Sequence, residues 1–467
     1  MRRLNLPMGL AWPRIRYRLR DAFWARARPF RLRAGRSPRE RTEIDRNIQY
    51  LYVEIFWAAI FSAVFAFNAT YALRLGATNQ MVGWLSSIPS LFAMVMMVPA
   101  ARFLEGRTHW GPWMVVSLVM GRFGFLLAAF IPWLFPDRAA EVVIYLFMLR
   151  TIPITFFNTG FSPLLADVLP ARDRARVFAN RSIISSAVTA VTAFLAGRWL
   201  DAAVDWTWAA FPLNYQLLYV VGGISALTSA YFVSKIKPPV RDVADDRGKQ
   251  IPGSAKRERL TLARLRGTMK TIAKERQAFL RLITNTLIFN LGAWLVMPLY
   301  TILFVRQLNA SDSWIGLNST LANLGVIAGY AFWRRGVNRL GDHRALRLTV
   351  PLAASYAFLV AFFPNLSLIL VWGILINLIN SGVNLSHTNV FYQVCPEERR
   401  ASYMAIYSSV MNAGAFVCPM IGVALSEVMD IRWVLLIGGM VRLLGAFMFH
   451  IWRIDEVRTG ELQTVSV

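Results

Sequence analysis

The stretch VLPARDRARVFA at residues 168–179 returns 226 residues later as VCPEERRASYMA at residues 394–405. Both copies keep the pattern V-x-P-x-x-x-R-A-x-x-x-A, and each lies between two long apolar stretches. At the same offset Asn158 corresponds to Asn384. A second repeat places TNQMVG at residues 78–83 opposite SDSWIG at residues 311–316, at an offset of 233. The chain is therefore predicted to contain two related halves in the same orientation.

Apolar stretches of about 20 residues make up most of the chain, and each can cross a ~30 Å hydrocarbon core as a helix. Twelve are bounded by charged residues, Gly, Pro, Asn or Asp: 48–73, 80–101, 111–135, 141–166, 178–199, 214–234, 279–305, 314–334, 346–363, 367–392, 402–426 and 432–452. The ninth is the weakest, because it is short and bounded by Pro351 and Pro364. We predict an all-α integral membrane protein with twelve transmembrane helices in two pseudo-symmetric six-helix bundles.

The composition supports this class. The 467 residues are 56% hydrophobic and only 16% charged, with a mean hydropathy of +0.43, whereas soluble domains average about 25% charged residues. These values exclude a water-soluble enzyme. The two cysteines, Cys395 and Cys418, make no disulfide framework. A β-barrel needs ~10-residue alternating strands, and the run from Leu126 to Leu134 does not alternate.

The formal charge of +25 is distributed unevenly along the chain. In the twelve-helix arrangement, 42 of the 51 Lys and Arg residues fall on the side of the N-terminus. Five fall on the opposite side: Arg74, Arg138, Arg198, Arg306 and Arg432. The positive-inside rule then predicts a multi-pass protein of the plasma (inner) membrane with both termini cytoplasmic. Nothing outside the N-terminal tail offers a basic face with readout elements, so we expect no nucleic-acid partner.

The same pattern divides the chain into five parts: a basic cytoplasmic tail at 1–46, a six-helix bundle at 47–234, a cytoplasmic loop at 235–276, a second bundle at 277–453 and a cytoplasmic tail at 454–467. The first tail has no apolar signal-peptide core. In it Ile15, Leu19 and Phe23 recur at a spacing of four, which indicates either a basic amphipathic helix on anionic lipids or a disordered segment that sets topology. Residues 262–272 also keep helical spacing.

This layout resembles the major facilitator superfamily over roughly residues 45–455. In that superfamily the loop after helix 2, and less strictly after helix 8, reads G-x-x-x-D-R-x-G-R-R. Here the second of these loops has Asn338 in the acidic position, and the loop after the fourth stretch is similar to the superfamily's helix 4 exit. The resemblance implies that the loops act as conformational elements through Glu105, Arg107, Asp167, Arg174, Arg339, Arg344 and Arg400.

The charged residues clearly inside the spans, away from their ends, are few: Glu54, Arg122, Arg150 and Arg442. Each costs about 2.5–3.5 kcal/mol at a helix centre on insertion scales. The resemblance implies that helices 1, 4, 7 and 10 line a central cavity, which Glu54 and Arg150 would face. Glu54 is then either a carboxylate paired with a cytoplasmic Arg or a protonatable coupling group. Arg150 either braces backbone carbonyls or contacts an anionic substrate group or coupling partner.

A polar stripe marks the tenth stretch, where Asn377, Asn380, Asn384 and His387 follow one face. It predicts either hydrogen bonds between helices or a substrate-binding face, to which Asn68, Asn158 and Asn290 add amides from the first, fourth and seventh stretches. The fifth stretch lacks the G-x-x-x-G-P-x-x-G-G signature of drug/proton antiporters. Its stripe of Thr189, Ala193 and Gly197 predicts a close helix-packing seam instead.

Enzymatic motifs are absent from the sequence, which has no P-loop, no HExxH and no His/Cys metal spacing, so we expect no catalysis, cofactor or metal. The favoured hypothesis is a secondary transporter that moves a small organic solute by rocker-switch alternating access, as a monomer in the bilayer, either coupled to a proton or another ion or uncoupled. Two alternatives remain open. One is a non-transporting protein of the same fold that assists assembly or senses a ligand, and the other is a lipid flippase.

Overall fold

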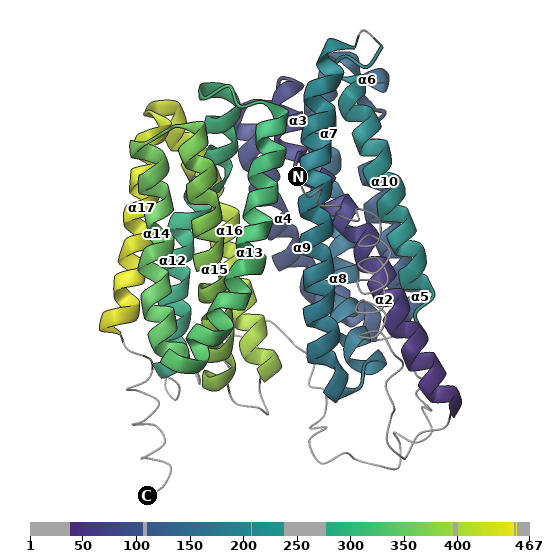
Figure 1. Ribbon diagram of the computed structural model, residues 1–467, viewed down its shortest axis with the longest axis vertical. Coiled ribbons are helices and arrows are strands. Elements are labelled where there is room, and N and C mark those ends of the chain that lie inside the picture. The colour runs from purple at the N-terminus through teal and green to yellow at the C-terminus, as the bar shows by residue number, and fades with distance from the viewer. Residues whose placement is uncertain are drawn as a thin grey trace, which may run out of the picture.

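The computed structural model describes residues 38–105, 110–206, 208–237, 277–395, 400–452 and 454. Within these ranges the chain forms helices and short connections, arranged as two bundles side by side (Figure 1). The tail segment around Ile15, Leu19 and Phe23 and the stretch with helical spacing at 262–272 lie outside the described residues.

The N-terminal bundle contains α2 (Pro38–Phe65), α3 (Asn68–Arg74), α4 (Asn79–Glu105), α5 (Trp110–Leu127), α6 (Ile131–Leu134), η1 (Pro136–Arg138), α7 (Ala139–Leu149), α8 (Thr151–Val168), α9 (Ala171–Ala202), η2 (Ala203–Asp205) and α10 (Leu213–Ser234). Three predicted spans are therefore not single helices, contrary to expectation. The fourth is interrupted at Arg150, because Pro153 has no N–H to bond the carbonyl of residue 149. Pro132 has the same effect on the third span, and the first is interrupted at Ala66 and Phe67.

The C-terminal bundle contains α12 (Gln277–Ile302), η4 (Leu303–Gln307), α13 (Asp312–Leu340), α14 (Asp342–Phe362), α15 (Leu366–Val394), α16 (Arg400–Val428) and α17 (Ile431–Ile451). Pro351 does not bound the ninth span as predicted, since it lies inside α14. Packing of α15 and α17 against α14 supports the helix around the hydrogen bond that this proline cannot donate.

The predicted architecture is confirmed. Among the described residues, eleven helical segments are long and apolar enough to cross a membrane, and the shorter apolar helix Gly111–Leu127 accounts for the remaining predicted span. The two bundles meet where α9 packs along α13 and α4 packs along α16. Figure 1 shows α9 and α13 running beside each other between the bundles.

Each bundle has an even number of predicted spans, so the first and last described helices begin and end at the same side of the molecule. We call this side the terminal end, since it carries Pro38 and Ile451. The opposite side, which carries Arg74, Asp201, Arg306 and Asp312, is called the clasped end. At this end one buried apolar cluster contains residues of both bundles, including Leu73 and Val82 from the first and Phe304 and Val423 from the second.

Candidate functional site

The polar stripe of α15 lies on the side of the helix turned away from its exposed apolar residues. Val371 and Leu375 are 50% and 45% exposed, and in a membrane-spanning helix such a face is covered by lipid. Asn384 and Thr388 are also exposed, but at ~100° per residue they lie roughly on the opposite side of the helix. The amide face of α15 is thus turned away from the lipid.

The same arrangement occurs in the N-terminal bundle at the offset of 226 residues. Tyr145 and Leu149 correspond to Val371 and Leu375, and both are exposed. Asn158 corresponds to Asn384 and is exposed on α8. Each half therefore presents one exposed asparagine at an equivalent place in its fourth helix, on the side away from the lipid.

Two other polar residues of the stripe, Asn377 and His387, have partners within the C-terminal half. The Nδ2 of Asn377 donates to the carbonyl of Gly373 at 2.8 Å. The Nε2 of His387 lies 2.9 Å from the Oγ1 of Thr286 on α12. Asn380 is half-buried. The Nδ2 of Asn290 is 4.0 Å from the Sδ of Met411.

Glu54 is buried inside the N-terminal bundle, where its carboxylate has three polar neighbours. Its Oε2 is 2.8 Å from an Nη2 of Arg181, and its Oε1 accepts a hydrogen bond from Ser229 at 2.9 Å. Arg122 lies further away, at 3.9 Å from Oε1. The ion pair with Arg181 is the contact that the pairing interpretation expects, although Arg181 itself was not singled out. A coupling role for Glu54 stays a prediction.

Arg150 lies at the interruption between α7 and α8 and is also buried. Its Nε donates to the carbonyl of Gly121 on α5 at 3.1 Å. Its guanidinium lies 4.9 Å from the ring centre of Phe65, with the rings of Phe61 and Phe125 at 5.4 and 5.5 Å, distances at which cation–π attraction operates. In this conformation Arg150 braces a backbone carbonyl, and contact with a substrate stays a prediction.

Asn68 belongs to an aromatic core rather than to an open face. Its Oδ1 accepts a hydrogen bond from the hydroxyl of Tyr219 at 2.7 Å. The ring of Tyr219 packs on that of Tyr71, which also stacks on Tyr215. Because Tyr215 reaches the C-terminal half, this core connects the interior of the N-terminal bundle to the interface between the halves.

The predicted loop residues that the structure describes lie at the terminal end. Arg174 donates from Nε to the carbonyl of Leu169, which holds the turn between α8 and α9, and Arg339 and Arg344 are exposed. Arg107 and the side chains of Glu105, Asp167 and Arg400 lie outside the described residues. The structure adds Asp342, whose carboxylate accepts hydrogen bonds from Asn389 and Gln393 on α15, each at 2.7 Å.

Two arginines join the halves reciprocally at the clasped end. Arg74, the last residue of α3, donates to the carbonyl of Ala310 at 3.3 Å and lies 3.6 Å from the carboxylate of Asp312. Arg306, in η4, donates to the carbonyl of Ala77 and to the Oδ1 of Asn79, the latter at 2.6 Å. Ala77 and Asn79 correspond to Ala310 and Asp312 at the offset of 233. Each half thus offers one arginine and one turn to the other half, and we call this pair of contacts the clasp.

The two turns have the same backbone form. Gly76 and Asn309, which correspond at the offset of 233, are both in the left-handed region, with φ of 93° and 49°. The hydroxyls of Thr78 and Ser311 then accept the backbone N–H three residues on, which caps α4 and α13. The second repeat of the sequence therefore encodes a pair of equivalent turns that receive the arginines.

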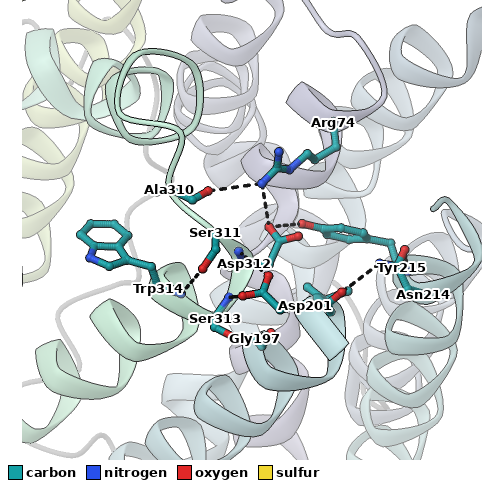
Figure 2. A network of polar contacts seen from close by, with 11 residues as sticks. Arg74, Gly197, Asp201, Asn214, Tyr215, Ala310, Ser311, Asp312, Ser313 and Trp314 are labelled. Carbon is teal, nitrogen blue, oxygen red and sulfur yellow. Dashed lines mark hydrogen bonds and ion pairs between the residues drawn. The ribbon is translucent and has the colours of Figure 1, made fainter. Parts of the chain in front are cut away.

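Asp312 is the most highly connected residue of these turns (Figure 2). The hydroxyl of Tyr215 donates to its Oδ1 at 2.7 Å. Asp201, at the end of α9, accepts the backbone N–H groups of Asp312 and Ser313 at 2.9 and 3.0 Å, one with each carboxylate oxygen. Asp201 therefore caps the N-terminus of α13 from the opposite half, where a negative charge is stabilising. Three elements of the N-terminal half, α3, α9 and α10, hold this one turn.

Apolar residues close the interface below these contacts. Val82 is buried in the cluster of the C-terminal half, and its counterpart Ile315 packs against the core of the N-terminal half. The predicted seam on α9 is confirmed at two positions, since Gly197 lies directly against the backbone of Asp312 and Ala193 against Gly316. A Cβ at Gly316 would clash with the Ala193 carbonyl, so the two helices approach as closely as glycine allows.

The residues of the clasp were not predicted as a site, but two signals in the sequence mark them. The repeat at residues 78–83 and 311–316 identifies both turns. The charge count identifies Arg74 and Arg306 among the five basic residues on the depleted side. Neither signal shows that one half's arginine binds the other half's turn. Among the described residues, no group of three or more His, Cys, Asp or Glu side chains could hold a metal ion.

The chain is similar to known proteins in both sequence and structure. Residues 282–465 match the sequence model of the Major Facilitator Superfamily. The chain is also similar to the solved structures of a mutant of the nucleoside transporter NupG and of the xylose transporter XylE from E. coli in an inward open conformation. The NupG structure has a TM-score of 0.61 and 12% identity, and the match covers 87% of this chain and 99% of that one. The XylE structure also has a TM-score of 0.61, with 10% identity over 88% of this chain and 94% of that one. The C-terminal part of the chain thus matches the superfamily in sequence, and the chain as a whole has the fold of these transporters.

A third similar structure is a bacterial homologue of the human lysosomal transporter Spinster in an inward-facing conformation, with a TM-score of 0.58 and 12% identity over 89% of this chain and 97% of that one. No curated protein matches the sequence. The sequence match covers the C-terminal half, and the N-terminal half shares the superfamily's fold. The protein is a multi-pass membrane protein with the fold of membrane transporters.

Proposed function

We propose that this protein is a secondary transporter that carries a small, neutral, polar organic solute between its two six-helix halves. The observation that carries the proposal is the exposed pair Asn158 and Asn384, at equivalent places on α8 and α15 and turned away from the lipid. Asn290, Asn377, Asn380 and His387 are proposed to extend this face. Amides supply both donors and acceptors, as hydroxyl-rich solutes require.

The solute is proposed to be neutral because the buried charged side chains of the N-terminal bundle are already engaged, and in the C-terminal bundle Arg442 lies over the ring of Phe289 at 4.5 Å. Glu54 is paired with Arg181, Arg122 donates to the carbonyl of Ala226 at 2.6 Å, and Arg150 donates to Gly121. A site that binds an ionic solute needs a counter-charge, because burying an unpaired ion is costly. Nucleosides and xylose, named for two of the similar structures, are neutral polar solutes and belong to this class.

Alternating access is supported by the unequal ends of the interface. The clasp of Arg74, Arg306 and the two turns holds the halves together at the clasped end. In the proposed cycle the solute enters from the terminal end in this conformation, and the clasp opens in the other. With both termini in the cytoplasm, as the charge count predicts, the clasped end faces the outside of the plasma or inner membrane.

The proposal is tested with purified protein in two steps. Thermal-shift screening against nucleosides, pentoses, hexoses, organic anions and organic cations identifies a stabilising solute. Counterflow of that radiolabelled solute is then measured in proteoliposomes. Stabilisation and counterflow by a neutral polar solute support the proposal. Stabilisation without flux would instead indicate a sensor or assembly protein, and movement of labelled phospholipid between leaflets would indicate a flippase.

A further inference from the structure

The two halves of the clasp are equivalent in shape but differ in charge. Arg306 meets the neutral amide of Asn79 at 2.6 Å, whereas Arg74 meets the carboxylate of Asp312 at 3.6 Å. Positions 79 and 312 correspond at the offset of 233 residues. One contact of the clasp therefore contains a group that can take up a proton, and its counterpart does not.

Asp312 is buried, with 5% of its surface exposed. The charged and titratable groups around it are Arg74 from α3, Asp201 from α9 and Tyr215 from α10. The guanidinium that pairs with Asp312, that of Arg74, is itself 38% exposed, and the carboxylate of Asp201 lies against the backbone of Asp312. A buried carboxylate is costly when its counter-charge is partly exposed to water, and binding one proton removes that cost.

The two carboxylates are not equally able to accept that proton. Both oxygens of Asp201 accept backbone N–H groups at the start of α13, so a proton on either oxygen would displace a hydrogen bond. The Oδ1 of Asp312 accepts one hydrogen bond, from Tyr215. A proton on its Oδ2 leaves that bond in place and cancels only the attraction to Arg74.

The geometry points to Asp312 as the residue through which protons in the solution at the clasped end open the transporter. One proton binds the carboxylate of Asp312, the ion pair with Arg74 is lost, and the opened state gains population. When the proton returns to the same solution, the ion pair forms again and the end closes. The contact between Arg306 and Asn79 contains no titrating group, so it holds the halves equally at each pH. A second carboxylate across this end, that of Glu427, accepts a hydrogen bond from Gln80 at 3.2 Å but is exposed, so its contact contributes little. This inference rests on the proposed function, because it assigns the clasped end a cycle of opening.

The test measures the distance across the clasped end without any solute. Spin labels are placed at Val204→Cys and Val428→Cys, two exposed positions at this end of the N- and C-terminal halves, after Cys395 and Cys418 are replaced by Ser. Distance distributions in lipid nanodiscs are recorded in mildly alkaline and in acidic buffer. We expect the ratio of open to closed molecules to rise about fivefold on acidification, which corresponds to about 1 kcal/mol of coupling.

Two variants separate the acid from the rest of the clasp. Asp312→Asn should be open to the same extent in both buffers, at the level that the unsubstituted protein reaches in acid. Asn79→Asp, the matched change in the other half, should close the end further in alkaline buffer and enlarge the response to acid. If Asp312→Asn does not fold, Arg74→Gln is measured in its place. This variant removes the counter-charge and leaves Asp312, and its response to pH should also be reduced.

The outcomes distinguish this inference from the proposed function. If the clasped end opens but Asp312→Asn and Arg74→Gln keep the full response to pH, the inference is overturned and alternating access stands. Opening that is the same in both buffers for the unsubstituted protein overturns it equally. If no variant opens at either pH, both the inference and the proposed cycle fail.

Discussion

Arg74 and Arg306 end the first and seventh spans, and each guanidinium crosses to the turn that follows the other. Both arginines bind an alanine carbonyl and the acceptor side chain two residues later. The two turns are related by the internal repeat, whereas the two arginines are not, because Arg74 corresponds to Gln307 at the offset of 233 residues. The interface at this end is therefore reciprocal, and loss of one arginine leaves the other.

We predict that either arginine substitution loosens the clasped end. The reporter is Val82→Cys in a protein without Cys395 and Cys418, because Val82 is 1% exposed in this conformation. Arg74→Ala and Arg306→Ala should each speed its labelling by a membrane-impermeant maleimide at least about threefold, as expected for a partly exposed charged contact. Arg198 is an exposed arginine at the clasped end of α9, and Arg198→Ala is the control. Labelling that is as slow in both variants as in the control would show that the arginines do not hold the end closed.

Glu54 tests whether buried charge in the N-terminal half is structural. Glu54→Gln leaves Arg181 and Arg122 buried without their anion, and breaking a buried pair in this way costs about 3–5 kcal/mol. We expect a clear fall in the thermal unfolding temperature of the purified protein. Glu43→Gln, at an exposed position in α2, should leave it unchanged. A Glu54→Gln protein with unaltered stability that no longer accumulates solute against a gradient would make Glu54 a coupling group instead.

The exposed asparagines test the proposed solute face. Asn158→Leu and Asn384→Leu each remove one amide, and the lost hydrogen bond to a bound solute is worth about 1–2 kcal/mol, so we expect counterflow to fall by roughly tenfold. Val371→Leu, on the lipid-facing side of α15, keeps the span apolar and should transport normally. Counterflow that is equal in all three variants would place the solute elsewhere.

Labelling from outside the cell tests the predicted orientation. Ser254 lies in the central loop, which the distribution of Lys and Arg places in the cytoplasm. A single cysteine at Ser254 should resist an impermeant reagent on intact cells and react after permeabilisation. The positive control is Val428→Cys, because that residue lies at the clasped end and is highly exposed. Rapid labelling at Ser254 on intact cells would reverse the orientation of the clasped end.

The sequence was sufficient to predict the fold because lipid limits the choices. Stretches such as 178–199 and 214–234 are apolar over the length of a membrane crossing, and such stretches form helices. Their interruptions were harder to predict, since Pro132 and Pro153 break two spans whereas Pro351 lies within α14. The difference depends on packing against neighbouring helices, which hydropathy does not contain.

The candidate site was predicted less completely. The periodicity of Asn377, Asn380 and Asn384 identified a polar face, because spacing along one helix is visible in the sequence. The partners of Glu54 and Arg150 come from other helices, Arg181 from α9 and Gly121 from α5, and the sequence does not state which helices are neighbours. The clasp has the same difficulty, because Arg74 and Asp312 are brought together only when the two halves pack.

The clasped end must open for solute to cross the membrane, and a reversible disulfide across this end tests that requirement. A Cβ at Gly83 on α4 lies 3.4 Å from the Cβ of Val423 on α16, close to the spacing of about 3.5–4.5 Å that a disulfide requires. Counterflow of the stabilising solute is measured in proteoliposomes with Gly83→Cys and Val423→Cys, without the native cysteines, before and after reduction, with each single variant as a control. The account predicts that the oxidised double variant does not transport and that reductant restores transport. Full transport by the oxidised protein, with the disulfide verified, would contradict it.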